Sequence, residues 1–324
     1  MLVLAAIFLG AFGAWFMARF AFAIGAIDAP NARSSHLTPT PRGGGLGILA
    51  AFLVSALSLS ASWSLWVPAA SLAVISFFDD RLDLSARFRL IAQCLAAFIA
   101  IFALHVTNFS LFNLLLFLPF ATIFIVGTTN FFNFMDGING IAAMTGSIAF
   151  GYLSWFAWFL NLGEVPFMLA LCLAAGCIGF LPFNFPHAKV FMGDVGSVLL
   201  GFMYSLLVLQ LSVSVADFLC LSGFMFLFYA DTLTTLFIRW RDDENLSQAH
   251  RRHLYQILAN ELQVAHWKVS TGYGVVQAGV GILMIAARNL GVFPQLILWL
   301  MLSLVFVFVT WYIRGKSAKV KSFL

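Results

Sequence analysis

The sequence predicts an all-α fold, a polytopic integral membrane helical bundle of about 11 transmembrane helices. Hydrophobic residues make up 62% of the 324 positions and charged residues only 9%, whereas soluble chains average roughly 25% charged residues. The apolar residues form long uninterrupted runs, which are typical of spanning helices and lack the alternation of barrel strands. The composition therefore excludes a soluble enzyme and a transmembrane β-barrel, and it favours one membrane-embedded domain over residues 1–324.

Apolar runs supply the expected helices in chain order. The first follows Met1 directly, is longer than the apolar region of a signal peptide and lacks the basic residues that precede one, so we interpret it as a retained span. The runs cover residues 2–27, 44–61, 64–78, 90–105, 111–129, 140–160, 166–182, 197–213, 218–238, 269–287 and 294–313. An odd number of spans would place the two ends of the chain on opposite sides of the membrane.

Charge is distributed unevenly between the loops that join these runs. The alternate loops 28–43, 79–89, 130–139, 183–196 and 239–268, together with the tail 314–324, hold 15 of the 17 Lys and Arg residues. Because basic residues are retained on the cytoplasmic side during insertion, we expect a periplasmic N-terminus and a cytoplasmic C-terminus. The same loops contain ten of the 13 acidic residues. Simple connections do not need so many carboxylates, so we predict a polar site where the five loops meet.

The first two charged loops carry residues suited to phosphate and to a divalent cation. A glycine triplet at 43–45 follows the first loop and can cradle an anion, while Arg42 can pair with phosphate oxygens. An ordinary interhelical turn is the alternative. In the second loop Asp79 and Asp80 are adjacent, and two such carboxylates repel each other unless a cation such as Mg²⁺ compensates them. Arg89 would suit the same anion, and a solvated loop with internal ion pairs is the alternative.

The third loop spaces four polar residues three positions apart, namely Asn130, Asn133, Asp136 and Asn139. On a helical segment this spacing drifts only slowly around the axis, so we expect one face with three amides and one carboxylate. Amides suit a nucleobase or a sugar, and a carboxylate suits a metal or a hydroxyl group. Capping of a helix end would not require four such residues.

The fourth loop combines an amide, a base and a carboxylate directly before an apolar run. These residues are Asn184, Lys189 and Asp194, the last within a Gly-Asp-x-Gly-Ser segment. Capping of the following helix would explain Asp194 alone, but it does not explain the three residues together. We therefore expect a ligand-bearing turn here.

The fifth loop places His250 and His253 one helical turn apart, on either side of two arginines that include Arg252. This pattern predicts a phosphate-binding surface with a titratable group. Zinc is the weaker alternative, because no third ligand lies nearby in the sequence.

Two further charges, Arg19 and Asp231, fall inside predicted spans at similar depth from the charged loops. A charge within a bilayer is costly and usually faces a partner or a functional site. We therefore expect these two side chains to pair with each other.

The motifs, taken in order, resemble those of the polyprenyl-phosphate N-acetylhexosamine-1-phosphate transferases, the MraY/WecA-like superfamily. They are Pro-Asn-x-Arg-Ser-Ser-His with Arg-Gly-Gly-Gly, then Asp-Asp, Asn-x-x-Asn-x-x-Asp-Gly, Val-Phe-Met-Gly-Asp-x-Gly-Ser and His-Arg-x-His-Leu-Tyr-Gln. The first and last look most like those of WbpL-type O-antigen-initiating transferases. The resemblance covers residues 28 to 260 and keeps the order and spacing of the loops.

The resemblance implies a transferase that depends on Mg²⁺, with Mn²⁺ as an alternative metal. The implied reaction moves an N-acetylaminosugar-1-phosphate from a UDP-GlcNAc, UDP-FucNAc or UDP-QuiNAc donor to undecaprenyl phosphate, releases UMP and initiates O-antigen synthesis for lipopolysaccharide. The implied location is the lipid bilayer of a bacterial inner membrane, with the active site on the cytoplasmic face. No nucleic acid partner is expected, and a homodimer is left open.

Two other classes remain as alternatives from the residues themselves. A polytopic transporter would place its polar groups near the bilayer midplane, whereas here they collect in the loops of one face. A CDP-alcohol phosphotransferase would require an Asp-Gly-x-x-Ala-Arg segment, whereas Asp136 is followed by Gly-Ile-Asn-Gly.

Residue chemistry and the resemblance together define the expected site. Asp79 and Asp80 match the paired aspartates of the family. Asp136 matches its nucleotide pocket, and His253 matches the first histidine of its histidine motif. These four are the expected catalytic residues, and Asp194 is the implied metal ligand. The expected substrate-binding residues are Arg42, Arg89, Asn130, Asn133, Asn139, Asn184, Lys189, His250 and Arg252. The sequence departs from the family pattern at two places. Asn139 stands where many relatives have aspartate. Arg252 and Tyr255 replace the consecutive histidines of the last motif, and this second departure argues against a peptide-bearing substrate.

Overall fold

A computed structural model of the chain describes residues 1–30, 35–36, 38–82, 84–101, 111–246, 248 and 250–321. Its regular structure in these residues is helical apart from one antiparallel pair of short strands, β1 (Ile27–Asp28) and β2 (Thr40–Pro41). The helices are α1 (Leu2–Phe20), α2 (Leu46–Ser58), α3 (Trp63–Leu82), α4 (Ala86–Ile101), α5 (Leu111–Phe134), α6 (Ile141–Phe159), α7 (Glu164–Asn184), α8 (Asp194–Leu211), α9 (Val215–Gly223), α10 (Phe226–Arg241), α11 (Leu254–Gln256), the π-helical turn η3 (Ile257–Glu261), α12 (His266–Arg288) and α13 (Val292–Lys321).

The long helices follow the predicted apolar runs one for one, with a single exception. The run 218–238 is divided between α9 and α10, whose axes bend by 83°. Gln277 of α12 stabilises this break, because its Oε1 accepts from the Leu227 N–H (3.0 Å) and its Nε2 donates to the Gly223 carbonyl (3.0 Å). A buried side-chain amide thus satisfies backbone groups that a continuous helix would have paired internally.

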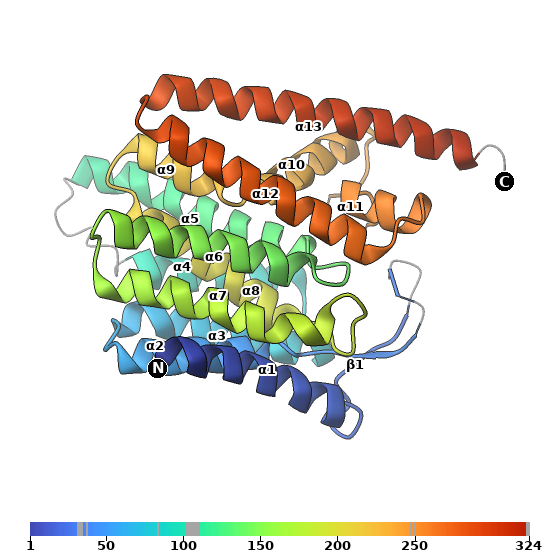
Figure 1. Cartoon of the computed structure of the whole chain (residues 1–324), viewed down its shortest axis with the longest axis horizontal. Coiled ribbons are helices and arrows are strands. Elements are labelled where there is room, and N and C mark those ends of the chain that lie inside the picture. The colour runs from blue at the N-terminus through green and yellow to red at the C-terminus, as the bar shows by residue number, and fades with distance from the viewer. Residues whose placement is uncertain are drawn as a thin grey trace.

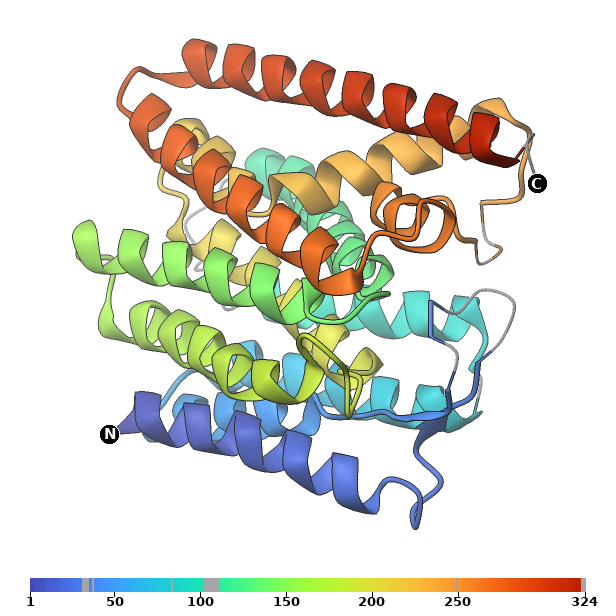
Figure 2. The same cartoon turned by 45° about the vertical axis from the view of Figure 1, so that its right-hand side comes forward.

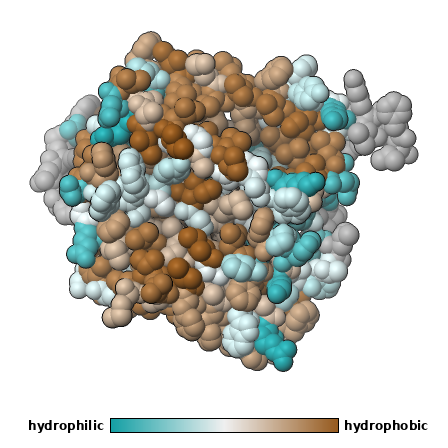
Figure 3. Space-filling model, viewed as in Figure 1, coloured by the Kyte–Doolittle hydropathy of each residue, from teal (hydrophilic) through white to brown (hydrophobic). Residues whose placement is uncertain are grey.

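The outer surface of the bundle is apolar. Large hydrophobic side chains are exposed along the outer helices, above all α1 and α13, and brown residues cover most of the face in Figure 3. Within the described part of the chain, six helices are long and apolar enough to cross a membrane, or seven if the bent pair α9–α10 is one span. The chain is therefore an all-α integral membrane protein. The predicted total of eleven spans and the orientation stay predictions, because helices such as α2 are shorter.

The helices lie side by side from α1 at one edge of the bundle to α13 at the other (Figure 1), and the order is the same in the rotated view of Figure 2. α8 is buried over most of its length and packs against α3 and α5. It is held in the interior by polar contacts such as that of Tyr204, whose hydroxyl donates to the Leu221 carbonyl (2.6 Å). The first residue of α8, Asp194, is thereby fixed at the end of the bundle where the charged loops gather.

Candidate active site

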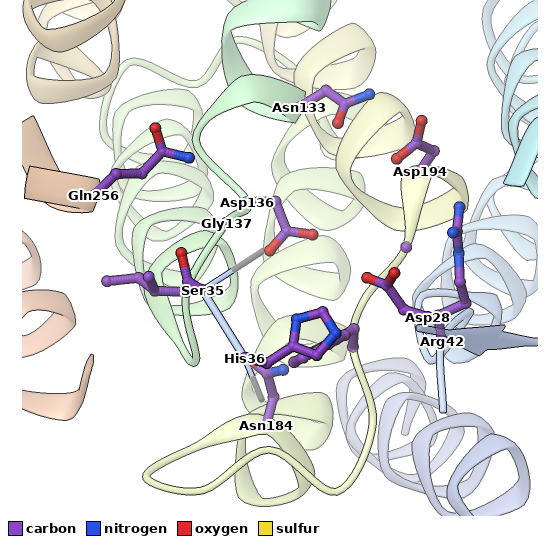
Figure 4. Close-up of a pocket in the computed structure, with 13 residues that line it drawn as sticks. Asp28, Ser35, His36, Arg42, Asn133, Asp136, Gly137, Asn184, Asp194 and Gln256 are labelled. Carbon is purple, nitrogen blue, oxygen red and sulfur yellow. The ribbon is translucent and has the colours of Figure 1, made fainter. Parts of the chain in front are cut away.

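Four of the five predicted site loops contribute residues to a pocket of about 270 Å³ at one end of the bundle, and the described part of the loop 79–89 contributes none. Its walls come from the first loop, the segment after α5, the end of α7, the start of α8 and one residue of α11. Figure 4 shows Asp136 near the middle, with Gln256 on one side and Asp194 and Arg42 on the other. Five predicted site residues line this pocket: Arg42, Asn133, Asp136, Asn184 and Asp194.

Backbone pairing between the first and fourth loops forms one wall of the pocket. The Phe191 N–H donates to the Pro41 carbonyl (2.8 Å), and the Gly44 N–H donates back to the Phe191 carbonyl (2.9 Å). The Gly45 N–H donates to the Met192 carbonyl (2.9 Å), and a Cβ atom on Gly45 would come within 2.5 Å of the Gly196 Cα. The prediction that the glycine triplet cradles an anion is wrong for Gly44 and Gly45, because their N–H groups pair with the fourth loop.

Asn184 joins the third and fourth loops behind the pocket. Its Oδ1 accepts from the Gly140 N–H (2.6 Å) and its Nδ2 donates to the Val190 carbonyl (2.9 Å). The residue is buried, with 5% of its surface exposed. One amide therefore fixes the distance between the segment that carries Asp136 and the segment that leads to Asp194.

Asp136 and Asp194 give the pocket two carboxylates. The amide of Asn133, in the last turn of α5, is hydrogen-bonded to the Asp194 side chain. Burial raises the pKa of Asp136 well above its usual range, and the charge of Asp194 adds to the shift. No cluster of three His, Cys, Asp or Glu side chains arranged for a metal occurs among the described residues. Two carboxylates and an amide still fit a hard cation such as Mg²⁺, which accepts few protein ligands and keeps several waters.

Asp79, near the end of α3, is buried and accepts hydrogen bonds from residues that follow it in the chain. Its Oδ1 accepts from the Leu84 N–H (2.7 Å) and its Oδ2 accepts from Arg89 Nη1 (3.2 Å). Both residues act electrostatically on Asp194, as does Arg42, so they are within range of an anion in the pocket. Asp80 belongs to α3, but its side chain lies outside the described residues.

Six of the nine predicted substrate-binding residues do not line the pocket, and three of these six belong to the third and fourth loops. Asn130 faces α4, where its Nδ2 donates to Gln93 Oε1 (2.6 Å). Asn139 donates to the Pro186 carbonyl (3.3 Å), and Lys189 is exposed. The prediction that the four residues of the third loop share one face is wrong, because α5 ends at Phe134 and the chain then turns. A role in substrate binding for these three residues stays a prediction.

His253 lies beside the pocket, and Asp231 holds the segment that carries it. Asp231 Oδ1 accepts from the Leu254 N–H (2.8 Å), and its Oδ2 accepts from the Tyr255 N–H (3.3 Å) and the Tyr273 hydroxyl (2.7 Å). His253 Nδ1 lies 3.4 Å from Asp231 Oδ1. These contacts leave the carboxylate fully enclosed and fix the short helix α11 against α10 and α12.

The expected pairing of Asp231 with Arg19 is wrong. Their helices, α10 and α1, lie on opposite sides of the bundle in both Figure 1 and Figure 2. The carboxylate is instead satisfied by backbone N–H groups and a hydroxyl, as buried charges can be. The Tyr255 hydroxyl then donates to the Phe134 carbonyl at the end of α5 (2.9 Å), so Asp231 acts on the pocket through α11.

Arg252 and His250 do not line the pocket. The Arg252 guanidinium donates to Asp242 (2.7 Å) and to Glu244. His250 Nδ1 accepts from the Arg252 N–H (3.3 Å), and its ring lies next to that of His253. Burial lowers the pKa of His250 to about 4, and the neighbouring His253 adds to this shift. Near neutral pH, His250 is therefore uncharged and adds no positive charge to a phosphate site.

The lowered pKa of His250 predicts a loss of stability in mild acid. In the unfolded chain His250 takes up a proton below its ordinary pKa of 6.5, whereas in the folded chain it takes up the proton only below about pH 4. The free energy of unfolding of the wild type should thus fall between about pH 6.5 and 4 by more than that of His250→Asn. Denaturant titrations in detergent at several pH values measure this, with the exposed His187→Asn as the control. Parallel pH curves for wild type and His250→Asn would contradict the prediction.

The pocket also contains residues that the sequence did not single out: Asp28, Ser35, His36 and Gln256. The His36 ring packs edge-on against Phe191, with centroids 4.8 Å apart, and its Nε2 is buried without a hydrogen-bond partner. A polar atom in this state is suited to a ligand group. Three of these residues, Ser35, His36 and Gln256, belong to the Ser-Ser-His and Leu-Tyr-Gln segments of the first and last motifs, but spacing alone did not show that they meet.

Known proteins are similar to this chain in sequence. Residues 62–212, which include α3 to α8 and the residues Asp79, Asp136 and Asp194, match the family model of glycosyl transferase family 4. The chain is 34% identical over 203 residues to a probable undecaprenyl-phosphate N-acetylglucosaminyl 1-phosphate transferase of Bacillus subtilis, covering 58% of this chain and 56% of that protein. It is 33% identical over 189 residues to a phospho-N-acetylmuramoyl-pentapeptide-transferase of Halalkalibacterium halodurans, covering 50% and 58%.

A third relative matches over a greater length. The chain is 30% identical over 290 residues to the decaprenyl-phosphate N-acetylglucosaminephosphotransferase of Mycobacterium tuberculosis, covering 75% of this chain and 70% of that protein. The chain spans little more than half the length of the first two relatives. The names of the first and third relatives describe transfer of N-acetylglucosamine phosphate with a polyprenyl phosphate, and the name of the second describes transfer of phospho-N-acetylmuramoyl-pentapeptide. The chain belongs to the MraY/WecA-like superfamily of polyprenyl-phosphate N-acetylhexosamine-1-phosphate transferases.

Proposed function

We propose that this chain transfers an N-acetylaminosugar-1-phosphate from a UDP-linked donor to undecaprenyl phosphate and releases UMP. The observation that carries the proposal is the pocket that combines Asp136, Asp194 and Arg42 at one end of a bundle of apolar helices. A lipid acceptor keeps its tail in the bilayer and its phosphate at the surface, while the donor is water-soluble. A site at the end of the bundle is where the two substrates can meet.

The reaction exchanges one phosphoanhydride for another. An oxygen of the lipid phosphate attacks the sugar-linked phosphorus of the donor, and the bond from that phosphorus to UMP breaks. Charge neutralisation and in-line positioning therefore dominate the catalysis. Arg42 and Arg89 neutralise phosphate oxygens, and Asp79 or Asp80 positions or deprotonates the lipid phosphate. Formation of a phospho-enzyme from the UDP-sugar without lipid would contradict this direct route.

Mg²⁺ is the proposed metal, with Mn²⁺ as a substitute. Asp136 and Asp194 would hold it, with the Asn133 amide beside them. When bound, the ion neutralises the negative charge of the donor pyrophosphate. Burial first, and then the charge of Asp194, raise the pKa of Asp136, so a bound cation would relieve both unfavourable effects.

The raised pKa of Asp136 predicts that metal binding depends on pH. A metal ion must displace the proton that Asp136 retains, so the affinity for Mg²⁺ should rise as the pH rises through the elevated pKa. Isothermal titration of the detergent-solubilised protein with Mg²⁺ in buffers of different ionisation enthalpy measures both the affinity and the proton released. Asp136→Asn should release no such proton. Equal proton release from the wild type and from Asp136→Asn would rule out this role of Asp136.

We also propose a membrane location and a biosynthetic role for this chain. The eleven apolar runs support eleven spans, and the distribution of Lys and Arg supports a periplasmic N-terminus and a cytoplasmic pocket. The family resemblance supports a bacterial inner membrane. The resemblance of the first and last motifs to WbpL-type initiators supports initiation of O-antigen synthesis.

The test of the proposed function is release of UMP by the purified protein. It is assayed with undecaprenyl phosphate and each of UDP-GlcNAc, UDP-FucNAc and UDP-QuiNAc, with Mg²⁺ or with a chelator. We expect UMP from at least one donor, only when lipid and metal are both present. No UMP from any of the three donors would contradict the proposal.

A further inference from the structure

A second cavity, of about 1210 Å³, lies between α10 and α13 at the same end of the bundle as the pocket. One part of its wall is apolar and consists of exposed residues that would face lipid, including Leu233, Phe237, Val307 and Trp311. Toward the loops the wall becomes basic, with five cations: Arg241, Arg251, Arg252, Arg314 and Lys316. The cavity thus joins an apolar groove to a positively charged end.

The lining of the cavity contains five cations and one acidic residue. Glu261 is the acidic residue in the lining, and the Arg252 guanidinium is paired with Asp242 and Glu244 nearby. Among the described residues, Arg314 and Lys316 form no salt bridge of their own. An anionic ligand would reduce the repulsion among them.

Two polar atoms of the lining lack a protein partner. Thr310 Oγ1 and Arg314 Nε are buried without a hydrogen bond, and only 2% of the Thr310 surface is exposed. Arg314 does donate through Nη2 to the Arg252 carbonyl, so the guanidinium is held in place with one donor unused. Native proteins rarely leave buried donors unsatisfied, and a ligand with acceptor oxygens would satisfy both atoms.

We propose that this cavity binds an anionic glycerophospholipid of the surrounding bilayer, with its phosphate against Arg314 and Lys316 and its acyl chains along α10 and α13. Basic pockets between membrane helices bind anionic head groups in this way. The apolar residues of the groove match the acyl chains, and an apolar ligand without a phosphate would leave the buried Arg314 Nε without an acceptor.

The occupant differs from the reacting lipid because a wall separates the two sites. The cavity and the pocket share no lining residue. The segment 252–257 lies between them, since Arg252 and Ile257 line the cavity while Gln256 lines the pocket. A phosphate beside Arg314 would therefore be on the opposite side of this segment from Asp136. By holding Arg314 against the Arg252 carbonyl, the bound phospholipid stabilises the chain that leads into His253.

The experiment measures lipid binding and does not require transferase activity. The full-length protein, delipidated in a neutral detergent, is titrated with fluorescent phosphatidylglycerol and with fluorescent phosphatidylcholine. The variants are Arg314→Gln, Lys316→Gln and, as a control with the same loss of charge, Lys268→Gln, whose side chain is exposed and outside the cavity. We expect phosphatidylglycerol to bind about fivefold more weakly to each cavity variant and with wild-type affinity to the control, and phosphatidylcholine to bind all four proteins equally.

Equal binding of phosphatidylglycerol to all four proteins would overturn the proposal. So would its stoichiometric displacement by undecaprenyl phosphate, because the cavity would then belong to the acceptor. Lys316 is exposed, so its replacement tests the site even if Arg314→Gln does not fold, and thermal unfolding of each variant identifies that case.

Discussion

Replacing Asp194 with asparagine is expected to slow sugar-phosphate transfer by about 100- to 1000-fold while the protein stays folded. Asp194 is the first residue of α8, lines the pocket and is hydrogen-bonded to Asn133. Asparagine keeps the size of the side chain and suits a helix N-terminus, but it removes the charge that would hold a divalent cation together with Asp136. The measurement is the initial rate of UMP release at saturating donor and Mg²⁺.

The matched control is Asp243→Asn. Asp243 is exposed, lies outside the pocket and has a φ of 54°, a conformation that asparagine tolerates. The control makes the same chemical change and should retain the wild-type rate. A wild-type rate in Asp194→Asn as well would remove this carboxylate from the catalytic site.

Replacing Asp231 with alanine should lower the free energy of unfolding by about 3–5 kcal/mol. The carboxylate is 1% exposed and accepts hydrogen bonds from the Leu254 and Tyr255 N–H groups and from the Tyr273 hydroxyl. Alanine would leave these donors buried and unpaired. Because α11 follows His253 directly, the transfer rate should also fall, even though Asp231 does not line the pocket. Chemical unfolding in detergent micelles measures the loss of stability.

A smaller change among the groups that hydrogen-bond to Asp231 provides a comparison for this loss of stability. Tyr273→Phe removes one donor and keeps the carboxylate, so the expected loss is about 1.5–3 kcal/mol, the range for a hydrogen bond to a charged group. If Asp231→Ala were no less stable than Tyr273→Phe, the carboxylate would not be the centre of the cluster.

The sequence predicted the helices well because apolar runs determine them directly. The predicted runs at 111–129 and 269–287 correspond to α5 and α12, and each is longer in the structure by no more than five residues at either end. The break between α9 and α10 could not be predicted, because the amide that stabilises it belongs to Gln277, in α12. A contact over 50 residues leaves no local signal in the sequence.

The candidate site was predictable in its loops but not in its geometry. Asp136, Asp194 and Arg42 do meet in one pocket, as the collection of charge in alternate loops indicated. The predicted pairing of Asp231 with Arg19 was wrong, because hydropathy identifies a buried charge but not the backbone N–H groups that satisfy it. Likewise Asn130 lies one turn before Asn133 in α5, yet it pairs with Gln93 of α4, because spacing within one helix does not show which neighbouring helix each side chain meets.

The most direct test of the central claim follows the phosphorus atom that the reaction transfers. A UDP-N-acetylaminosugar with a radiolabelled β-phosphate is incubated with the purified protein, undecaprenyl phosphate and Mg²⁺, and the lipid is then extracted. The account predicts label in the lipid fraction and unlabelled UMP in the aqueous fraction, both lost in Asp194→Asn. Labelled UDP in the aqueous fraction, with sugar but no label in the lipid, would show transfer of the sugar alone and contradict the account.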